Sequence, residues 1–185
     1  MKNALIVIVI LLVVIIGWGV ATNNRLVTLN ESINGSWAQV ETVLQRRYDL
    51  IPNLVSTVKG YAKHESSVLE EVTRLRSQWG EAKTADEKVA AANQLEGALA
   101  RLMVVIERYP DLKANQNFLA LQDELAGTEN RIAVERRRYN ETVQAYNTAV
   151  SKFPASLVAS VRGLQRRDVY FKAAEAAKEV PRVEF

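Results

Sequence analysis

The only histidine of the chain is the first place where metal or acid–base chemistry could be sought. His64 is followed directly by Glu65. A zinc-protease H-E-x-x-H motif would need a second histidine where Val68 stands, and a Glu-x-x-His pair would need a glutamate where Tyr61 stands. With one His and no Cys, only carboxylates remain as further ligands. We find no nucleophile set, glycine-rich phosphate loop or pair of catalytic carboxylates. We therefore expect no metal, no cofactor and no enzymatic activity.

A second group of candidate residues is polar although it occupies, or adjoins, the inward-facing positions of long helical repeats. Buried charges persist only when they are paired and hydrogen bonded. The simpler interpretation is an ion-pair layer between helices that fixes their register, as buried polar residues do in coiled coils. The alternative is a polar pocket that binds a small ligand or relays protons. The residues of this predicted buried polar layer are Arg46, Arg47, Asp49, Glu65, Glu129, Arg136 and Asn140.

Clusters of basic residues are candidates for contacts with membranes or partners. The triplet at residues 136–138 is best explained as a solvated helix face. Arg166 and Arg167 stand in a loop-like stretch and are better candidates for contacts with anionic lipid or a partner, as is the C-terminal Phe185. The net charge of +3 is small, and aromatic residues do not alternate with the basic ones. Nucleic-acid binding is therefore not expected.

Two unbroken apolar repeats predict the elements that carry these residues. They run over residues 33–79 and 118–153 and step by alternating threes and fours. A spacing of 3.5 kept for so long is typical of helices packed lengthwise, as in a coiled coil. The first repeat predicts a single helical rod of about 70 Å. Its phase is the same before and after Pro52, so we expect one helix with a kink at Pro52 rather than two helices.

Local signals predict where the other helices begin and end. Gly80 and the following E-A-K-T form a break, and Thr84 with Glu87 matches a capping box. The next helix should cover about residues 86–108 and end before Y-P-D at 109–111. The Phe153-Pro154 step ends the last long helix, and a short apolar helical segment follows at residues 157–164. Residues 171–179 should add a helical turn or two before a docked tail, V-P-R-V-E-F. An all-α antiparallel bundle is expected.

The N-terminal stretch predicts a membrane anchor. Residues 4–21 carry no charge over 18 positions, about the length that crosses a bilayer as a helix. A cleaved signal peptide is the alternative, but its apolar core is usually shorter and G-V-A-T-N-N offers a poor cleavage site. Lys2 and the chain amine face Arg25 alone across the span, which slightly favours a bundle outside the cytoplasm. Gly17 and Ala21 form a small-xxx-small pair that favours a homo-oligomer. The expected domains are an anchor at 1–24 and a helical region at 25–185.

Several blocks of this chain resemble the LemA family of bacterial membrane-anchored helical proteins. They are the N-terminal anchor, W-A-Q-V at 37–40, R-R-Y-D-L-I-P-N-L-V-S-T-V-K-G-Y-A-K-H-E at 46–65, Y-P-D-L-K-A-N-Q-N-F-L-A-L-Q-D-E-L from 109, T-E-N-R-I-A-V-E-R-R-R-Y-N-E-T-V-Q-A-Y-N from 128, and the end from Tyr170. The resemblance covers essentially the whole chain. It implies a single-pass protein of the bacterial cytoplasmic membrane with an antiparallel four-helix bundle. It brings no agreed reaction.

Two hypotheses for function follow from these residues. The first is a membrane-anchored, non-enzymatic scaffold or adaptor of the bacterial cell envelope that acts through self-association or through partner proteins of the envelope. It rests on the anchor, the long apolar repeats and the lack of a catalytic set. The second is a sensory or small-ligand-binding bundle that uses the buried polar layer. A closed, fully paired layer would count against the second hypothesis, and a deep polar pocket would support it.

Overall fold

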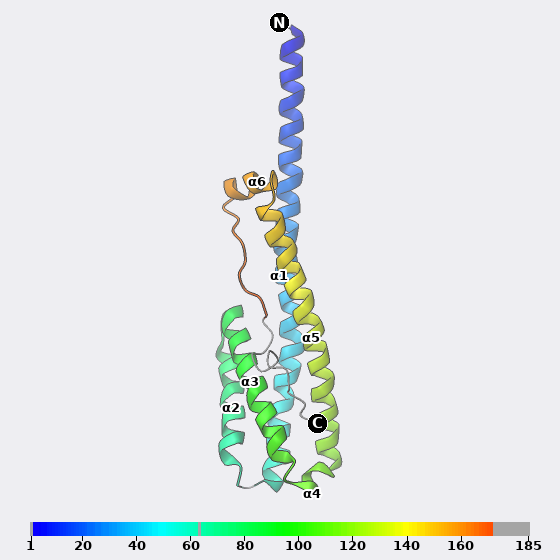
Figure 1. Ribbon diagram of the computed structural model, residues 1–185, viewed down its shortest axis with the longest axis vertical. Helices are drawn as coiled ribbons and strands as arrows, with labels where there is room; N and C mark the ends of the chain where they lie inside the picture. Colours follow the sequence, from blue (N-terminus) through cyan, green and yellow to red (C-terminus); the bar gives the residue numbers. More distant parts are fainter. Residues whose placement is uncertain (1, 63, 172–185) are drawn as a thin grey trace, which may run out of the picture. The chain divides into compact units, whose positions relative to one another are not determined.

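The computed structural model describes residues 2–62 and 64–171, and most of them are helical. No β-strand occurs within those two ranges. Figure 1 shows the helices, which confirm the predicted all-α class. In chain order they are α1 (Lys2–Tyr61), α2 (Ser66–Glu81), α3 (Ala85–Ile106), α4 (Pro110–Lys113), α5 (Gln116–Ser151) and α6 (Ala155–Val161).

Helix α1 is one continuous helix of 60 residues. It passes without interruption through residue 24, where the sequence suggested a domain boundary, and through Pro52. Three hydroxyl groups of this helix donate to the carbonyl four residues earlier: Thr28 at 3.0 Å, Ser32 at 2.8 Å and Ser36 at 2.6 Å. These bonds satisfy polar side chains within the helix itself. The helix therefore leaves the apolar segment with no non-helical linker.

The first part of α1 exposes its apolar side chains. Every large apolar side chain between Leu5 and Val20 is 41–66% exposed. An 18-residue window of this helix has a mean hydropathy of 3.2 and is wholly unburied, so α1 is long and apolar enough to cross a membrane. Helix α3 is also long and apolar enough to cross a membrane, with a mean hydropathy of 1.3 over 18 residues. However, 39% of this stretch is buried, as expected for a core helix.

The first apolar repeat does not form a single rod. Helix α1 ends at Tyr61 and α2 begins at Ser66, so the expectation of one helix over residues 33–79 is wrong. The phase survives because Val58 and Leu69, on either side of the connection, both face the core and are 0% and 5% exposed. Spacing reports which face of a helix is apolar. Spacing does not reveal that the chain reverses direction when the connection keeps the apolar residues at the same intervals.

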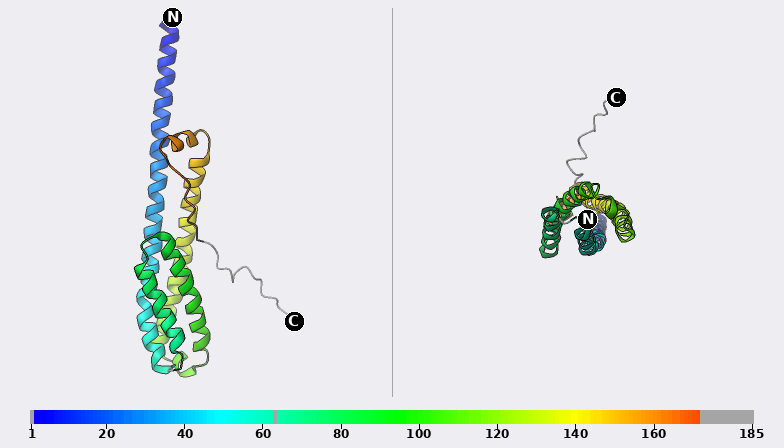
Figure 2. Two further views of the ribbon diagram at one scale, coloured as in Figure 1. Left: turned by 90° about the vertical axis from the view of Figure 1, so that its left-hand side faces the viewer. Right: turned by 90° about the horizontal axis from the view of Figure 1, so that it is seen from below.

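The chain divides into two compact units, of which one contains Gln39–Arg137 and Phe171. Within it α2 and α3 lie side by side and antiparallel, as Figure 2 shows. Most buried side chains of this unit come from the apolar faces of α1, α2, α3 and α5, and α4 adds Leu112. They include Val40, Leu44, Tyr48, Ile51, Leu54 and Val58 of α1, Leu69, Val72, Leu75 and Trp79 of α2, Leu95, Leu99, Leu102 and Ile106 of α3, and Phe118, Leu125 and Ile132 of α5.

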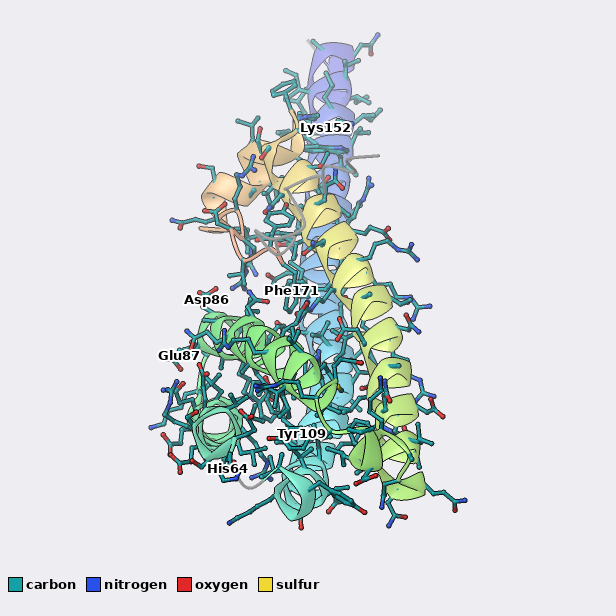
Figure 3. All side chains as sticks on the ribbon, turned by 60° about the horizontal axis from the view of Figure 1, so that its bottom comes forward. His64, Asp86, Glu87, Tyr109, Lys152 and Phe171 are labelled. Atoms are coloured by element: carbon teal, nitrogen blue, oxygen red, sulfur yellow. The ribbon has the colours of Figure 1, made fainter. Side chains whose placement is uncertain are left out.

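The start of α3 has the predicted capping box. The Thr84 hydroxyl accepts from the Glu87 N–H at 3.2 Å, and the Glu87 carboxylate accepts from the N–H groups of Thr84 at 3.1 Å and Lys83 at 2.8 Å. The N–H of Lys83, followed by that of Thr84, lowers the pKa of Glu87 below its ordinary value. Figure 3 shows Asp86 and Glu87 in the first turn of α3. The observed α3 agrees with the predicted helix within two residues.

The other compact unit contains Met1–Ala38 and Arg138–Tyr170. Trp37 and Tyr139 pack edge to face, with ring centroids 5.6 Å apart. Asn147, which is 3% exposed, donates to the Arg167 carbonyl at 2.7 Å and to the Tyr170 hydroxyl at 2.9 Å, and it accepts from the Arg167 N–H at 2.8 Å. This buried amide therefore holds the non-helical segment after α6 along α5.

The second apolar repeat extends beyond the end of α5. The repeat predicts that Phe153 faces inward, but α5 ends at Ser151 and Phe153 is 79% exposed. Once the helix ends, the 3.5 spacing no longer determines which way a side chain points. The short segment expected after Pro154 is helical and forms α6. Residues 172–179 of the expected last turns, the tail and Phe185 lie outside the described residues.

Candidate functional site

A buried arginine on α1 is the centre of the candidate site. Arg47 is 9% exposed, and its Nη1 forms an ion pair with the Glu129 carboxylate of α5. The Glu129 side chain is 41% exposed, so water still reaches its carboxylate but hardly reaches the Arg47 guanidinium. The pair offsets the desolvation of Arg47, which would otherwise be a buried, uncompensated charge. The Arg47 Nε is buried and has no hydrogen-bond partner among the described residues.

Arg47 and Glu129 also line a cavity of about 420 Å³. Its volume falls within the range of small-molecule pockets, about 300–1,000 Å³. Glu96 of α3 and Glu107, just after α3, add carboxylates to the wall, and Lys113 adds an amine. The remaining walls are mainly apolar. They are formed by Leu99, Ala100, Met103, Ile106, Phe118, Leu125 and Ala126, with the polar Gln122 among them.

A second arginine lies close to this cavity. Arg136 of α5 has a side chain that is 17% exposed, and its Nη1 donates to Glu96 at 3.2 Å. Its guanidinium stands 5.2 Å from the centre of the Phe171 ring, a cation–π distance. The Arg136 Nε and Nη2 are buried without a partner among the described residues. Because Glu96 and Glu129 both line the cavity, each ion pair contributes its carboxylate to the wall.

Tyr48 is buried beside both arginines. Burial raises the pKa of its hydroxyl, while the charges of Arg47 and Arg136 act in the opposite direction. Its ring stacks on Trp79 of α2, with centroids 4.1 Å apart and an interplanar angle of 15°. The Tyr48 hydroxyl has no partner within the described ranges. The site therefore combines a stacked aromatic pair with the buried guanidinium of Arg47 and the partly buried guanidinium of Arg136.

The backbone carbonyl of Tyr48 has an uncommon donor. In an α-helix it would accept from the N–H of residue 52, but Pro52 has none. The Nε of Arg76 on α2 donates to this carbonyl at 3.1 Å. A side chain of the neighbouring helix thus replaces the bond that proline removes. This explains physically how α1 continues through Pro52, whose own ring is on the exposed surface.

The other predicted polar residues are divided among separate places. Arg46 is exposed and pairs with Glu124 at 3.0 Å, and exposed Asp49 accepts from Gln45 at 2.7 Å. Both point away from Arg47, because on a helix Arg46 is turned by about 100° and Asp49 by about 200° relative to it. Glu65 lies in the connection before α2, where Arg108 at 2.7 Å and the Tyr109 hydroxyl at 3.1 Å donate to it. Asn140 is half-buried on α5 in the other compact unit.

Glu65 does not line the cavity, because its partners Arg108 and Tyr109 lie just after the end of α3. Burial, and then the hydrogen bond to Glu65, raise the pKa of Tyr109. Figure 3 shows Tyr109 at the end of α3. His64 is exposed. Within residues 2–62 and 64–171, no three His, Cys, Asp or Glu side chains gather as metal ligands.

Sequence reasoning missed several partners of the polar residues. Arg76 occupies an inward position of the first repeat, and a buried role could have been inferred from that position. Glu96 follows buried Leu95 on α3, so its position at the border of an apolar stripe was also visible. Glu124 and Arg108 are exposed charges with no distinguishing pattern. Which charge meets which depends on helix pairing.

Comparisons with known proteins identify similar chains. A family model described as the LemA family matches residues 36–185. Magnetosome protein MamQ 1 of Paramagnetospirillum magneticum is 28% identical over 173 residues, covering 80% of this chain and 64% of the relative. Magnetosome protein MamQ of Magnetospirillum gryphiswaldense is 26% identical with the same coverage. Protein LemA of Metamycoplasma hominis is 26% identical over 168 residues, covering 89% and 74%. The chain thus spans slightly less than two thirds of the MamQ relatives.

Proposed function

Because this chain belongs to the LemA family, we propose that it is a membrane-anchored, non-enzymatic helical scaffold or adaptor of the bacterial cell envelope. The observation that carries the proposal is the continuity of α1. The exposed apolar segment at its start and the buried side chains near its end belong to one 60-residue helix. An apolar run of this exposure needs a non-aqueous environment, and a bilayer supplies one. The anchor would then hold the packed helices directly at the cytoplasmic membrane.

In this proposal the helices after the anchor form an antiparallel four-helix bundle of α1, α2, α3 and α5 with coiled-coil-like packing. Ion pairs that join different helices support it. Glu41 of α1 pairs with Lys88 of α3, and Glu71 of α2 pairs with Arg101 of α3 at 2.7 Å. The Arg47–Glu129 and Arg136–Glu96 pairs link α5 to α1 and α3. Such pairs would set helix register rather than perform chemistry.

The proposed scaffold works through contacts with copies of itself or with unidentified envelope proteins. Gly17 and Ala21 are exposed on the apolar segment, and a side chain added at Gly17 would meet open space within this chain. Two such segments can therefore approach closely through these small residues. The charge balance across the segment favours a bundle outside the cytoplasm.

Protease protection and cross-linking test the scaffold proposal together. In intact spheroplasts, added protease should cut the bundle, and cross-linking in native membranes should give dimers or larger species. The variant Gly17→Leu should weaken the cross-linked dimer, whereas the control Val13→Leu in the same segment should not. Extraction of the chain by alkaline carbonate would contradict the anchor. Recovery of monomer alone, with no cross-linked partner, would contradict the scaffold.

The cavity beside Arg47 favours a second candidate function, the binding of a small amphiphile that carries a hydrogen-bond acceptor. The buried Nε of Arg47 is a donor without a partner in the described residues, at the wall of a largely apolar cavity. Both cations of the wall are already paired with glutamates, so an uncharged ligand oxygen would accept from such a donor, and an apolar tail would fill the remaining volume.

Native mass spectrometry of the full chain, released from nanodiscs, tests this candidate. A bound small molecule should persist in the wild type and in the control Arg46→Met, whose side chain is exposed. It should be lost in Arg47→Met. If all three proteins carry the same adduct, or none carries one, the cavity is not a ligand site of this kind.

A further inference from the structure

Helix α6 and its approach carry an exposed apolar stripe. Val161 is 88% exposed, Phe153 is 79% exposed and Leu157 is 58% exposed. Val161 and Phe153 are the two most exposed large apolar side chains in the described part of the chain. The three residues are spaced by four, and Leu157 and Val161 share one face of α6. An apolar stripe of this exposure marks a contact surface rather than a surface that faces only water.

The stripe lies beside the end of the apolar segment of α1. A cleft of about 450 Å³ is lined by Ile16, Gly19, Val20 and Asn23 of α1 and by Leu157, Val158, Val161 and Arg162 at α6. All of them belong to the same compact unit, and Figure 1 shows α6 next to α1. Whatever environment surrounds the end of the apolar segment therefore also surrounds α6.

The depth of this contact fits a membrane interface. If residues 4–21 cross the bilayer, Ile16 lies about 8 Å from the end of the span, at 1.5 Å per residue. Interfacial helices bury their apolar faces about 5–10 Å into the boundary between headgroups and acyl chains. Leu157 and Val161 line the same cleft as Ile16, so lipid would cover them at a suitable depth.

Charge at this end of the unit also fits a lipid surface. Exposed basic side chains come from Arg25 of α1, from Lys152 just after α5, which Figure 3 labels, and from Arg162 and Arg166 after α6. The cleft itself is apolar at Ile16 and polar at Asn23, whose buried Oδ1 has no donor among the described residues. A phospholipid has the same order of groups, from acyl chain to headgroup. Basic residues at this level attract anionic headgroups.

We infer that α6, together with Phe153, is an interfacial segment that inserts its apolar stripe into the bilayer beside α1 and contacts anionic phospholipid headgroups through Arg162 and Arg166. This inference rests on the proposed membrane anchor, because it places Ile16 inside the bilayer. It gives the chain a second membrane contact in addition to the span.

Lipid quenching of single labels tests the inference. The chain contains no cysteine, so one introduced Cys provides a unique labelling site. The full chain carrying Leu157→Cys or Val161→Cys is labelled with a small environment-sensitive fluorophore. It is then reconstituted into vesicles of phosphatidylcholine and phosphatidylglycerol that contain a nitroxide lipid. The matched control is Gln144→Cys, an exposed position of α5 in the same compact unit.

Both α6 labels should be quenched several-fold more strongly than the control label. The variants Arg162→Gln and Arg166→Gln should reduce the quenching in these vesicles and leave it unchanged in vesicles of phosphatidylcholine alone. Equal quenching at 144, 157 and 161 would overturn the inference. So would labels that are shielded in native membranes but not quenched by lipid, because a protein would then cover the stripe.

A label on the anchor separates this inference from the proposed function. Ile10→Cys lies within the apolar segment and should be quenched strongly by a nitroxide placed deep in the acyl chains. If Ile10→Cys is quenched and the α6 labels are not, the interfacial segment is refuted and the anchor stands. If Ile10→Cys is not quenched, both proposals are refuted.

Discussion

The Arg76 bond to the Tyr48 carbonyl can be tested by a double-mutant cycle. Pro52 has no N–H, so α1 itself cannot supply the donor that this carbonyl needs. The Nε of Arg76 supplies it from α2 at 3.1 Å. We expect Arg76→Met to destabilise the wild-type chain far more than it destabilises the Pro52→Ala variant, because an alanine at that position brings back the missing N–H.

The magnitude follows from the type of bond. A hydrogen bond that involves a charged group contributes about 1.5–3 kcal/mol to the free energy of unfolding, and Arg76→Met removes it. In the Pro52→Ala background the carbonyl stays paired, so the same substitution should cost only about 0.5–1 kcal/mol from changed packing of the side-chain stem. Because the packing cost is common to both backgrounds it cancels, and the coupling free energy should be about 1.5–3 kcal/mol, well above the error of additivity for independent sites.

Guanidinium unfolding of the full chain in detergent, followed by helical circular dichroism, provides the assay. Arg74→Met is the matched control, because Arg74 is an exposed arginine of the same helix. It should cost little with either residue at position 52. If Arg76→Met lowers the free energy of unfolding equally in the two backgrounds, the bond does not compensate for Pro52 and the reasoning is refuted.

Three further predictions concern the ion pair, the α3 cap and the buried amide. Glu129→Ala should destabilise the chain by about 3 kcal/mol because it leaves buried Arg47 unpaired. Arg47→Met should cost only about 1 kcal/mol, because half-exposed Glu129 is then hydrated by water. Equal losses of the free energy of unfolding in denaturant would contradict this asymmetry. The lowered pKa of Glu87 stabilises the fold above the ordinary carboxyl pKa of 4.5, and this contribution is lost as the pH falls through the lowered value. Glu87→Gln, which can keep the cap, should therefore flatten the acid limb of a plot of unfolding midpoint against pH, and an unchanged limb would count against the cap. Asn147→Ala removes three hydrogen bonds at a 3% exposed position and should cost about 3 kcal/mol, with faster proteolysis after α6, while Gln144→Ala should change neither measurement.

Local signals in the sequence were sufficient for much of the fold. The capping box at Thr84 and Glu87 involves residues three apart, so its geometry is encoded locally, and α3 begins where it predicts. The uncharged stretch at residues 4–21 is visible as composition alone. The apolar repeats identified the buried faces of the long helices, because a helix places residues three and four apart on one side.

The polar site could be anticipated only as a set of residue types. The repeat marks Glu129 and Arg136 as charges at inward positions, which is a valid signal for pairing. It does not reveal that their partners are Arg47 and Glu96, which lie 82 and 40 residues away along the chain. The apolar face of one helix does not indicate which other helix packs against it.

By itself, the sequence determined the all-α class, the apolar segment, the α3 cap and the inward faces of the helices, because each depends on residues within a few turns of one another. Only the tertiary structure decided the return of the chain between α1 and α2, the donation from Arg76 to the Tyr48 carbonyl, the cavity beside Arg47 and the position of α6 next to Ile16. Each of these depends on which helices pack together and at what register. That choice is made by the summed packing of whole faces, which no local spacing records.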